Sequence, residues 1–448
     1  MTGRRLFTRR QAIATSSAGL AGAMINLKLP GIANLEQDKL AIKGGPMVHP
    51  GSWPQWPQWN REAEEGITAM LRTGRWWRGS GEHVIDFEKK YAEMNGVKRC
   101  LATSSGTSAL LVSLDALGID AGDEVLVSPF TFVASFNVIL MKKALPVFVD
   151  SDPDTFLMDP AAIGKNVNER TRGILPVHIY GLPADMDKIN TESRKHNLQV
   201  IEDACQAWLA VYKGKKVGTL GDLGCFSFQN SKNIPAGEGG AIISNNEALM
   251  DRCHSIHNCG RPYGSVKTGS GYALNGGNYR MQQMQALILL SQMEKFSENA
   301  EKRHSNAMYL ASKLAGIPGI KPVKLAEGAE IPAWHFYPFR FVSGEFDNVS
   351  REMFMKALNA EGINCSDGYD PPQKEELFRV TLSSRGFKRL FPEDRIRRWF
   401  EEVSLPSNDR LCKEAVIIYQ SMLLGSRQDM DDIVNAIWKI YRNRKELV

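Results

Sequence analysis

The chain has 448 residues, of which 43% are hydrophobic and 23% are charged, and its formal net charge at pH 7 is +5. A chain of this length and composition can bury a large core, and we expect it to hold two domains. The small net charge, with no basic cluster interleaved with aromatic residues, argues against nucleic acid as a partner. Its seven cysteines lack Cys-x-x-Cys or other metal-ligand spacing, so we expect no metal site.

The first thirty residues have the layout of an export signal. Four arginines lie within the first ten residues, a weakly apolar run covers residues 12–25, and the first acidic residue is Glu36. That run is too short and too mild for a transmembrane helix, so we expect no stable membrane insertion. The segment Phe7–Ile13 resembles a twin-arginine motif, although Ala12 stands where a phenylalanine is usual. We therefore predict that residues 1–30 are a twin-arginine signal peptide and that the protein is periplasmic or exported. The alternative is a basic tail on a cytoplasmic protein.

Residues 31–60 predict an extended N-terminal arm, because they hold four prolines and three tryptophans. Aromatic residues in such an arm can pack on a neighbouring subunit, and we expect them to have a structural role. The arm leads into an expected helix, Arg61–Leu71, and a second helix, Ile85–Asn95.

Residues 61–330 are expected to form a large domain in which strands alternate with helices. Short apolar runs mark the strands, and periodic apolar residues mark the helices. Such alternation is typical of an α/β fold with a mostly parallel sheet that is covered on both faces. The expected elements are helix 107–118, strand Glu124–Val127, helix Thr131–Met141, strands Leu145–Val149 and Gly173–Ile179, helix Asp187–Lys195, strands Val200–Asp203, Cys225–Phe228 and Ala241–Ser244, helix Glu247–Asn258, and one long helix from Met281 to about Leu314.

Residues 331–448 are expected to form a smaller C-terminal α+β domain, because the pattern changes near Ile331. The expected elements are strand Trp334–Val342 and helices Arg351–Glu361, Asp409–Met422 and Gln428–Arg442.

A run of small and hydroxyl-bearing residues, Ala102–Leu110, leads into the helix expected over residues 107–118. Hydroxyl groups and free backbone N–H groups at a helix N-terminus bind phosphate. The alternative is an ordinary N-cap, which any one serine or threonine would satisfy.

Asp203 stands at the carboxyl end of an expected strand, where ligands bind in open α/β sheets. A buried carboxylate there can pair with the pyridinium nitrogen of pyridoxal phosphate and make the ring an electron sink. The alternative is that Asp203 caps the next turn.

Lys232 is the only cation in the segment Gly224–Ser244, which has the pattern of a strand, a tight loop and a strand. Desolvation in a cramped apolar loop lowers the pKa of a lysine, and an amine that loses its proton can form a Schiff base. The alternative is a surface lysine in a turn.

The order of phosphate cradle, aspartate and lysine resembles that of the fold-type I pyridoxal-phosphate enzymes, and in particular the DegT/DnrJ/StrS sugar aminotransferase family. The resemblance covers roughly Trp53 to the C-terminus. It implies a large domain with a mostly parallel seven-stranded sheet, a smaller α+β domain, pyridoxal 5'-phosphate as cofactor, and a homodimer. The matching blocks are Ser-Ser-Gly-Thr-Ser-Ala-Leu (104–110), Gly-Asp-Glu-Val-Leu-Val-Ser-Pro-Phe-Thr-Phe-Val-Ala (122–134), Pro-Val-Phe-Val-Asp (146–150), Glu-Asp-Ala-Cys-Gln-Ala (202–207) and Gly-Glu-Gly-Gly-Ala (237–241).

Four further segments are closest to one branch of this family, which includes the aminohydroxybenzoate synthases and the scyllo-inosose aminotransferases. That branch acts on cyclitol or cyclohexene ketones. The segments are residues 74–79, 176–187, 226–230 and 259–262.

The resemblance also implies a role for each matching residue. Lys232 would form the Schiff base and then move the proton between substrate and cofactor, and Asp203 would keep the pyridine nitrogen protonated. Gln206 matches the side chain near the cofactor's phenolic oxygen, and Phe132 matches the aromatic residue that stacks on the ring. Asn278 matches the residue that reaches the phosphate of the partner subunit; the alternative is that it only caps the long helix. The residues that would hold the phosphate are Gly106, Thr107, Ser108 and Ser227.

The implied activity is transfer of an amino group from glutamate or glutamine to a keto-sugar or keto-cyclitol. Two alternatives are a dehydratase or lyase of the same family and a non-catalytic regulator that binds the cofactor. Trp208 and Leu209 follow Gln-Ala where the family usually has His-Gly, and a tryptophan beside the cofactor can reshape the substrate pocket. His335 and Tyr337 are further candidates for pocket residues, with a packing role as the alternative.

Overall fold

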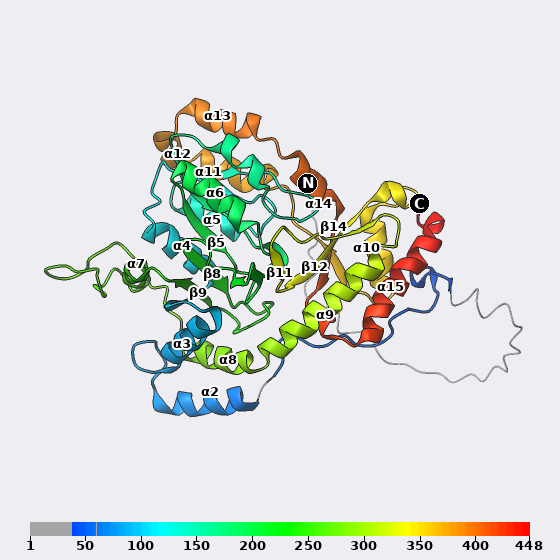
Figure 1. Ribbon diagram of the computed structural model, residues 1–448, viewed down its shortest axis with the longest axis horizontal. Coiled ribbons are helices and arrows are strands. Elements are labelled where there is room, and N and C mark those ends of the chain that lie inside the picture. The colour runs from blue at the N-terminus through cyan, green and yellow to red at the C-terminus, as the bar shows by residue number, and fades with distance from the viewer. Residues whose placement is uncertain (1–37, 60) are drawn as a thin grey trace, which may run out of the picture.

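The computed structural model describes residues 38–59 and 61–448, which form a larger and a smaller lobe (Figure 1). The predicted signal peptide, residues 1–30, lies outside the described residues, so the signal and the export both stay predictions. No helix in the described part of the chain combines the length and the hydropathy that crossing a bilayer requires.

A seven-stranded sheet forms the centre of the larger lobe and confirms the predicted α/β fold. Its strand order is β1-β9-β8-β5-β4-β2-β3. The neighbours from β8 to β3 pair in parallel, and β9 is antiparallel to both of its neighbours. Buried strands need nearly continuous apolar sequence, as in Val125–Val127. The strands are β1 (Arg99–Thr103), β2 (Glu124–Val127), β3 (Leu145–Phe148), β4 (Thr171–Leu175), β5 (Gln199–Asp203), β8 (Leu223–Ser227) and β9 (Gly240–Ser244).

The register between β5 and β8 brings the predicted site residues to one edge of this sheet. Asp203 pairs with Cys225, and Ser227 ends β8 two residues later. Ligands bind at this carboxyl edge in α/β sheets.

Helix α4 (Gly106–Ala116) packs against β5, β8 and β9, with α5 (Ala134–Met141) and α7 (Glu247–His257) beside it. It is apolar on nearly every side, which is typical of a helix buried within a lobe. Asn246 caps α7, because its Oδ1 accepts a hydrogen bond from the N–H of Leu249 at 3.1 Å. The other helices of this lobe are α2 (Arg61–Thr73), α3 (His83–Asn95) and α6 (Met186–His196).

The prediction of one long helix from Met281 to about Leu314 is wrong. Two helices, α8 (Gln283–Glu294) and α9 (Phe296–Leu314), meet at Lys295, which leaves the helical conformation. Helix α8 packs on α2 and α3, whereas α9 runs on to the smaller lobe and contacts α15 (Figure 1). The apolar stripe of a single straight helix would not face both sets of partners.

The smaller lobe holds an antiparallel sheet of four strands in the order β10-β12-β14-β13. The helix predicted over Asp409–Met422 is wrong in its second half, because α14 (Pro406–Glu414) ends and β14 (Ala415–Tyr419) follows. Val416 and Ile418 in β14 are buried between β12 and β13, where β-branched side chains favour a strand. The other elements are β10 (Ile320–Pro322), β12 (Phe336–Phe341), β13 (Cys365–Asp367), α10 (Arg351–Ala360) and α15 (Arg427–Arg442).

Three short helices that the sequence pattern did not predict return from the smaller lobe to the large sheet. They are α11 (Glu376–Leu382), α12 (Arg385–Leu390) and α13 (Glu393–Glu402). The indole N–H of Trp399 donates to the backbone oxygen of Pro146 at 2.7 Å, and Arg395 forms a two-point ion pair with the fully buried Glu124. The chain thus crosses between the lobes again after residue 330, and the domain limits stay a prediction. A small third sheet joins β6 (Val211–Tyr212), β7 (Lys215–Lys216) and β11 (Ala329–Ile331).

The described part of the N-terminal arm packs on its own chain. The indole N–H of Trp53 donates to the backbone oxygen of Gly362 at 2.8 Å in the smaller lobe. The indole N–H of Trp56 donates to the backbone oxygen of Lys232 at 2.9 Å. The arm therefore ends against the loop that carries the predicted Schiff-base lysine.

Candidate active site

A cavity of about 510 Å³ opens at the carboxyl edge of the large sheet. Residues 335, 336 and 369 of the smaller lobe complete its wall. A larger cavity of about 670 Å³ beside α13 contains none of the predicted residues. The predicted residues that line the first cavity are Gly106, Thr107, Phe132, Asp203, Gln206, Ser227 and Lys232; the two that do not are Ser108 and Asn278.

The N-terminus of α4 faces this cavity and carries a cluster of serine hydroxyls. Ser105 caps the helix, because its Oγ accepts a hydrogen bond from the N–H of Ser108 at 3.0 Å. The hydroxyl of Ser108 lies 2.9 Å from those of Ser104 and Ser105, so it supports the helix end from behind. The positive end of the helix and its free N–H groups favour an anion such as phosphate.

Gly106 allows this helix end to approach the strands closely. A Cβ atom at this position would lie 2.7 Å from the Cβ of Ser227 and 2.9 Å from the Sγ of Cys205. Both distances are shorter than real contacts of a Cβ atom, so only glycine fits without a shift of the helix or the strand ends. Because Ser227 lines the cavity with Gly106, any such shift would widen the predicted phosphate site.

Asp203 lies at the floor of the cavity with 4% of its surface exposed. Its Oδ2 accepts a hydrogen bond from the Ser135 hydroxyl at 2.7 Å, and its Oδ1 accepts one from the N–H of Cys205 at 3.1 Å. The alternative role of Asp203, as a cap of the next turn, is thus also fulfilled by one oxygen. A carboxylate that is fixed and buried in this way favours a protonated nitrogen placed opposite it.

The amide of Gln206 has a fixed orientation. Its Oε1 accepts a hydrogen bond from the N–H of Tyr180 at 2.8 Å, and its Nε2 donates to the hydroxyl of Tyr369 at 3.1 Å. The second proton of Nε2 remains available to the cavity. Burial raises the pKa of Tyr369 to about 12, so this residue keeps its proton at neutral pH. Tyr369 follows β13 in a segment whose sequence pattern gives no sign of a functional role.

Lys232 lies in the loop between β8 and β9, as predicted, and is half-buried. Burial lowers the pKa of its ammonium group, and the nearby Cys205 and Asp203 oppose this shift only in part. Its Nζ atom lies 3.5 Å from Nε2 of His335. The lysine is therefore not a surface residue, and its amine is easier to deprotonate than that of an exposed lysine.

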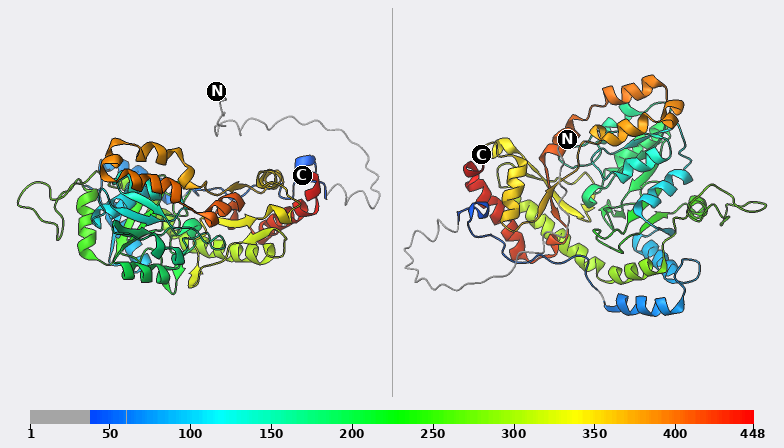
Figure 2. Two further views of the ribbon diagram at one scale, coloured as in Figure 1. Left: turned by 90° about the horizontal axis from the view of Figure 1, so that it is seen from above. Right: turned by 180° about the vertical axis from the view of Figure 1, so that it is seen from behind.

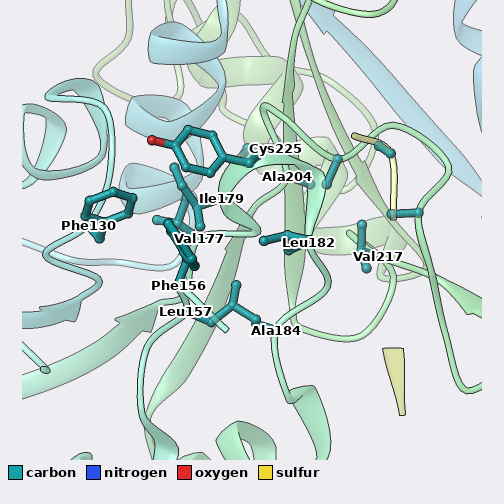
Figure 3. Close-up of a cluster of buried hydrophobic side chains, with 14 of the residues drawn as sticks. Phe130, Phe156, Leu157, Val177, Ile179, Leu182, Ala184, Ala204, Val217 and Cys225 are labelled. Carbon is teal, nitrogen blue, oxygen red and sulfur yellow. The ribbon is translucent and has the colours of Figure 1, made fainter. Parts of the chain in front are cut away.

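Phe132 and Phe130 have different positions. Phe132 lines the cavity and exposes 56% of its surface, so its ring is accessible to a ligand. Phe130 belongs to the buried cluster of Figure 3. Its ring packs edge-on against the rings of Phe156 and Tyr369. Phe130 thus holds the tyrosine that binds Gln206.

Trp208 does not lie in the cavity wall, so the expectation that it reshapes the substrate pocket is not met by direct contact. It is fully buried, and its indole N–H donates to the backbone oxygen of Ser227 at 3.0 Å. Its ring meets that of His335 edge-on at 5.6 Å. His335 lines the cavity, whereas Tyr337 is buried outside it and has the packing role.

Asn278 is exposed and lies outside the cavity of its own chain. It does not cap a helix, because α8 begins at Gln283 and has Gln282 as its N-cap. The loop that precedes it, between α7 and α8, projects from the larger lobe (Figure 2). The predicted contact of Asn278 with a partner subunit stays a prediction.

Comparison with known proteins decides the family. Residues 57–421 match the family model described as "DegT/DnrJ/EryC1/StrS aminotransferase family". The chain belongs to this aminotransferase family. The predicted resemblance and the predicted enzyme class, an aminotransferase, are both confirmed.

The relatives of this DegT/DnrJ/EryC1/StrS chain include cyclitol enzymes. It is 34% identical over 417 residues to an L-glutamine:2-deoxy-scyllo-inosose aminotransferase of Streptomyces paromomycinus, a match that covers 90% of this chain and 98% of that protein. Among solved structures, 3-amino-5-hydroxybenzoic acid synthase superposes with a TM-score of 0.77 at 28% identity, over 88% of this chain and 99% of that one. NtdA from Bacillus subtilis, solved with bound cofactor PMP, superposes with a TM-score of 0.71 at 27% identity, over 85% of this chain and 81% of that one. The fold-type I architecture is confirmed.

The cavity residues fit pyridoxal phosphate. A helix N-terminus suits the phosphate group, a fixed buried carboxylate suits the ring nitrogen, and an amine with a lowered pKa suits the aldehyde.

Proposed function

We propose that this aminotransferase uses pyridoxal 5'-phosphate to move an amino group from glutamine to a keto-cyclitol. The observation that carries the proposal is the convergence of the α4 N-terminus, Asp203 and Lys232 on one cavity. Glutamine and a cyclitol are chosen because the Streptomyces paromomycinus relative, whose match covers 90% of this chain, carries these substrates in its name. A keto-sugar acceptor and a glutamate donor are the broader alternatives.

Each residue would have a defined task when the cofactor is bound. The cofactor supplies an electron sink that stabilises the charge left on the substrate after a proton is removed. The α4 N-terminus and Ser227 hold the phosphate, and Asp203 keeps the proton on the ring nitrogen. Lys232 would hold the cofactor covalently, and its amine, once free, would accept and return the substrate proton. The second N–H of Gln206 binds the phenolic oxygen.

The test is an absorbance spectrum of the purified protein with pyridoxal phosphate, recorded before and after glutamine is added. We expect a visible band that glutamine converts to a band at shorter wavelength, and an aminated product when 2-deoxy-scyllo-inosose follows. Lys232→Ala should bind the cofactor without a covalent link and form no product. Lys216→Ala is the matched control, because Lys216 is also half-buried with a pKa lowered by burial but lies outside the cavity.

Other outcomes point to the alternatives. A protein that takes up no cofactor would refute the proposed chemistry. A visible band that responds to no amino donor would favour the regulator, and loss of water from a cyclohexene ketone without a donor would favour the lyase. Conversion of a nucleotide-linked keto-sugar in place of the cyclitol would retain the aminotransferase and replace its acceptor.

We also propose that the enzyme acts as a homodimer in which Asn278 reaches the cavity of the partner subunit. The exposed position of Asn278 outside its own cavity supports this arrangement. If it is correct, Lys232→Ala and Asn278→Ala subunits are each inactive alone, and their random mixture regains about a quarter of the wild-type activity, because half of the dimers are mixed and each has one intact site. A mixture that stays inactive, although subunit exchange is shown by mass, would contradict it.

A further inference from the structure

One ring nitrogen of His335, Nε2, faces the amine of Lys232, and its protonation state follows from the hydrogen bonds around the ring. The Nδ2 of Asn233 donates to the backbone oxygen of Ala333 at 2.8 Å, which fixes the orientation of that amide. Its Oδ1 therefore faces Nδ1 of His335 at 3.3 Å and can only accept, so Nδ1 carries the proton. Nε2 then holds a lone pair, and this is the atom 3.5 Å from Nζ of Lys232.

Backbone hydrogen bonds to one neighbouring segment, residues 180–181, hold this histidine in place. The N–H of His335 donates to the backbone oxygen of Tyr180 at 2.8 Å, and the N–H of Ala333 donates to that of Gly181 at 2.9 Å. Tyr180 and Trp334 both have positive φ angles, 56° and 51°. Backbone conformations of this kind cost free energy in residues other than glycine, and they persist where the surrounding structure enforces them, often beside functional groups.

The surroundings of the ring favour its neutral form. His335 is 2% exposed. The centroid of its ring lies 5.6 Å from that of Trp208 and 4.3 Å from that of Phe336. The charged groups that act on it are both cations, Lys232 and Arg303. Burial, reinforced by these two cations, lowers the pKa of His335 well below its ordinary value. A neutral ring with the proton on Nδ1 offers an acceptor to the lysine at neutral pH.

We propose that His335 is a positioning residue that accepts an N–H of the Lys232 amine at Nε2 and keeps that amine aimed at the reacting carbon. The proposal rests on the proposed function, in which the lysine amine is released when the donor binds. An amine that donates one N–H to His335 still has its lone pair for the substrate proton, whereas a freely rotating amine samples unproductive directions. No proton moves from lysine to histidine in this role.

Three variants separate this role from a packing role. His335→Phe keeps an aromatic ring and removes both nitrogens. His335→Gln keeps an acceptor at a similar distance. Asn233→Asp keeps the shape of the neighbour but favours a doubly protonated ring, whose Nε2 can no longer accept. His196→Gln is the matched control, because His196 is a half-buried histidine on α6 that lies outside the cavity.

The first measurement is the glutamine half-reaction of each holoenzyme, followed by stopped-flow absorbance. We expect His335→Phe and Asn233→Asp to lower the rate at saturating glutamine by about 10- to 100-fold, in the range that alignment of a reacting group contributes. The glutamine concentration that gives half of the maximal rate should stay nearly unchanged. His335→Gln should recover most of the rate, and His196→Gln should match the wild type.

The second measurement does not depend on turnover. The pH at which the visible band of the lysine–cofactor link changes is read for each variant. A cationic ring in Asn233→Asp should move this transition to lower pH by about one unit, because a nearby cation disfavours the protonated link. A purely structural loss would not shift it in this direction.

Several results would overturn the role of His335. One is a His335→Phe enzyme that reacts within twofold of the wild type. Another is a variant in which only the substrate concentration for half of the maximal rate rises, because that result means that the imidazole binds the substrate. A third is failure of His335→Gln to recover the rate while cofactor content and melting temperature match the wild type. Failure of the proposed function is distinct, since the wild-type visible band would then not respond to glutamine.

Discussion

Replacing Gly106 with alanine tests the close contact on which the phosphate site depends. The added Cβ would lie 2.7 Å from a Cβ on strand β8 and 2.9 Å from the Sγ of Cys205. The first of these atoms is the Cβ of Ser227, the last residue of β8, and the strand backbone fixes its position. Overpacking of this kind costs about 1–3 kcal/mol, and we expect about 2 kcal/mol here because one of the two neighbours is rigid.

Two assays measure this cost separately. The melting temperature of the apoprotein should fall by about 2 °C, because the entropy of unfolding grows with chain length and 1 kcal/mol corresponds to only about one degree in a chain of 448 residues. Affinity for pyridoxal phosphate, titrated by visible absorbance, should fall by at least about tenfold, since 1.4 kcal/mol is one factor of ten and the strain separates α4 from Ser227. Gly344→Ala is the control, because a Cβ there meets no atom within 4 Å and the backbone needs no positive φ.

A double variant checks that the contact itself is responsible. Cys205→Ala removes the Sγ atom at 2.9 Å, so Gly106→Ala/Cys205→Ala should regain part of the lost affinity relative to Cys205→Ala alone. The reasoning is refuted if Gly106→Ala melts and binds the cofactor like Gly344→Ala.

Three further predictions concern other parts of the molecule. Asp203→Asn keeps the shape of the side chain but loses its charge, so we expect kcat to fall by about 100-fold or more with cofactor still bound; activity within tenfold would show that the charge is not needed. Arg395→Ala leaves Glu124, which is 0% exposed, without the arginine that forms its two-point ion pair. The free energy of unfolding, measured by urea titration, should fall by about 3 kcal/mol, and a loss below about 0.5 kcal/mol would show that the pair has no role in stability. Burial lowers the pKa of His254 from 6.5 to about 4, so between these values the unfolded chain binds a proton that the native protein does not, and stability falls as pH falls through this window. His254→Gln should reduce the slope of unfolding free energy against pH between pH 6 and 4.5, a range inside that window, and an unchanged slope would contradict the assignment.

The sequence alone determined the parts of the site that lie next to one another in the chain or at strand ends. Asp203 stands at the end of an apolar strand, Lys232 lies in the loop between two apolar strands, and Gly106 stands at the start of a buried helix. Local patterns carry this information, because strand and helix periods and the glycine requirement are properties of short segments. The family followed from the order of these three features and from the blocks around them.

Local pattern failed where burial by distant segments chose between a helix and a strand. The run Ala415–Tyr419 is a central strand because β12 and β13 pair with it on both sides. The break at Lys295 exists because α8 and α9 have different partners. Neither set of partners can be read from the segment itself.

Only the tertiary structure decided which residues complete the site from far along the chain. Tyr369 reaches Gln206 across 163 residues, and His335 reaches Lys232 across 103. Trp56 binds the backbone of Lys232 from the arm, and Trp208 supports His335 instead of lining the pocket. These contacts depend on how the smaller lobe and the arm close over the carboxyl edge of the large sheet. The sequence therefore determined the chemistry of the site, and the packing of the two lobes determined the positions of its supporting groups.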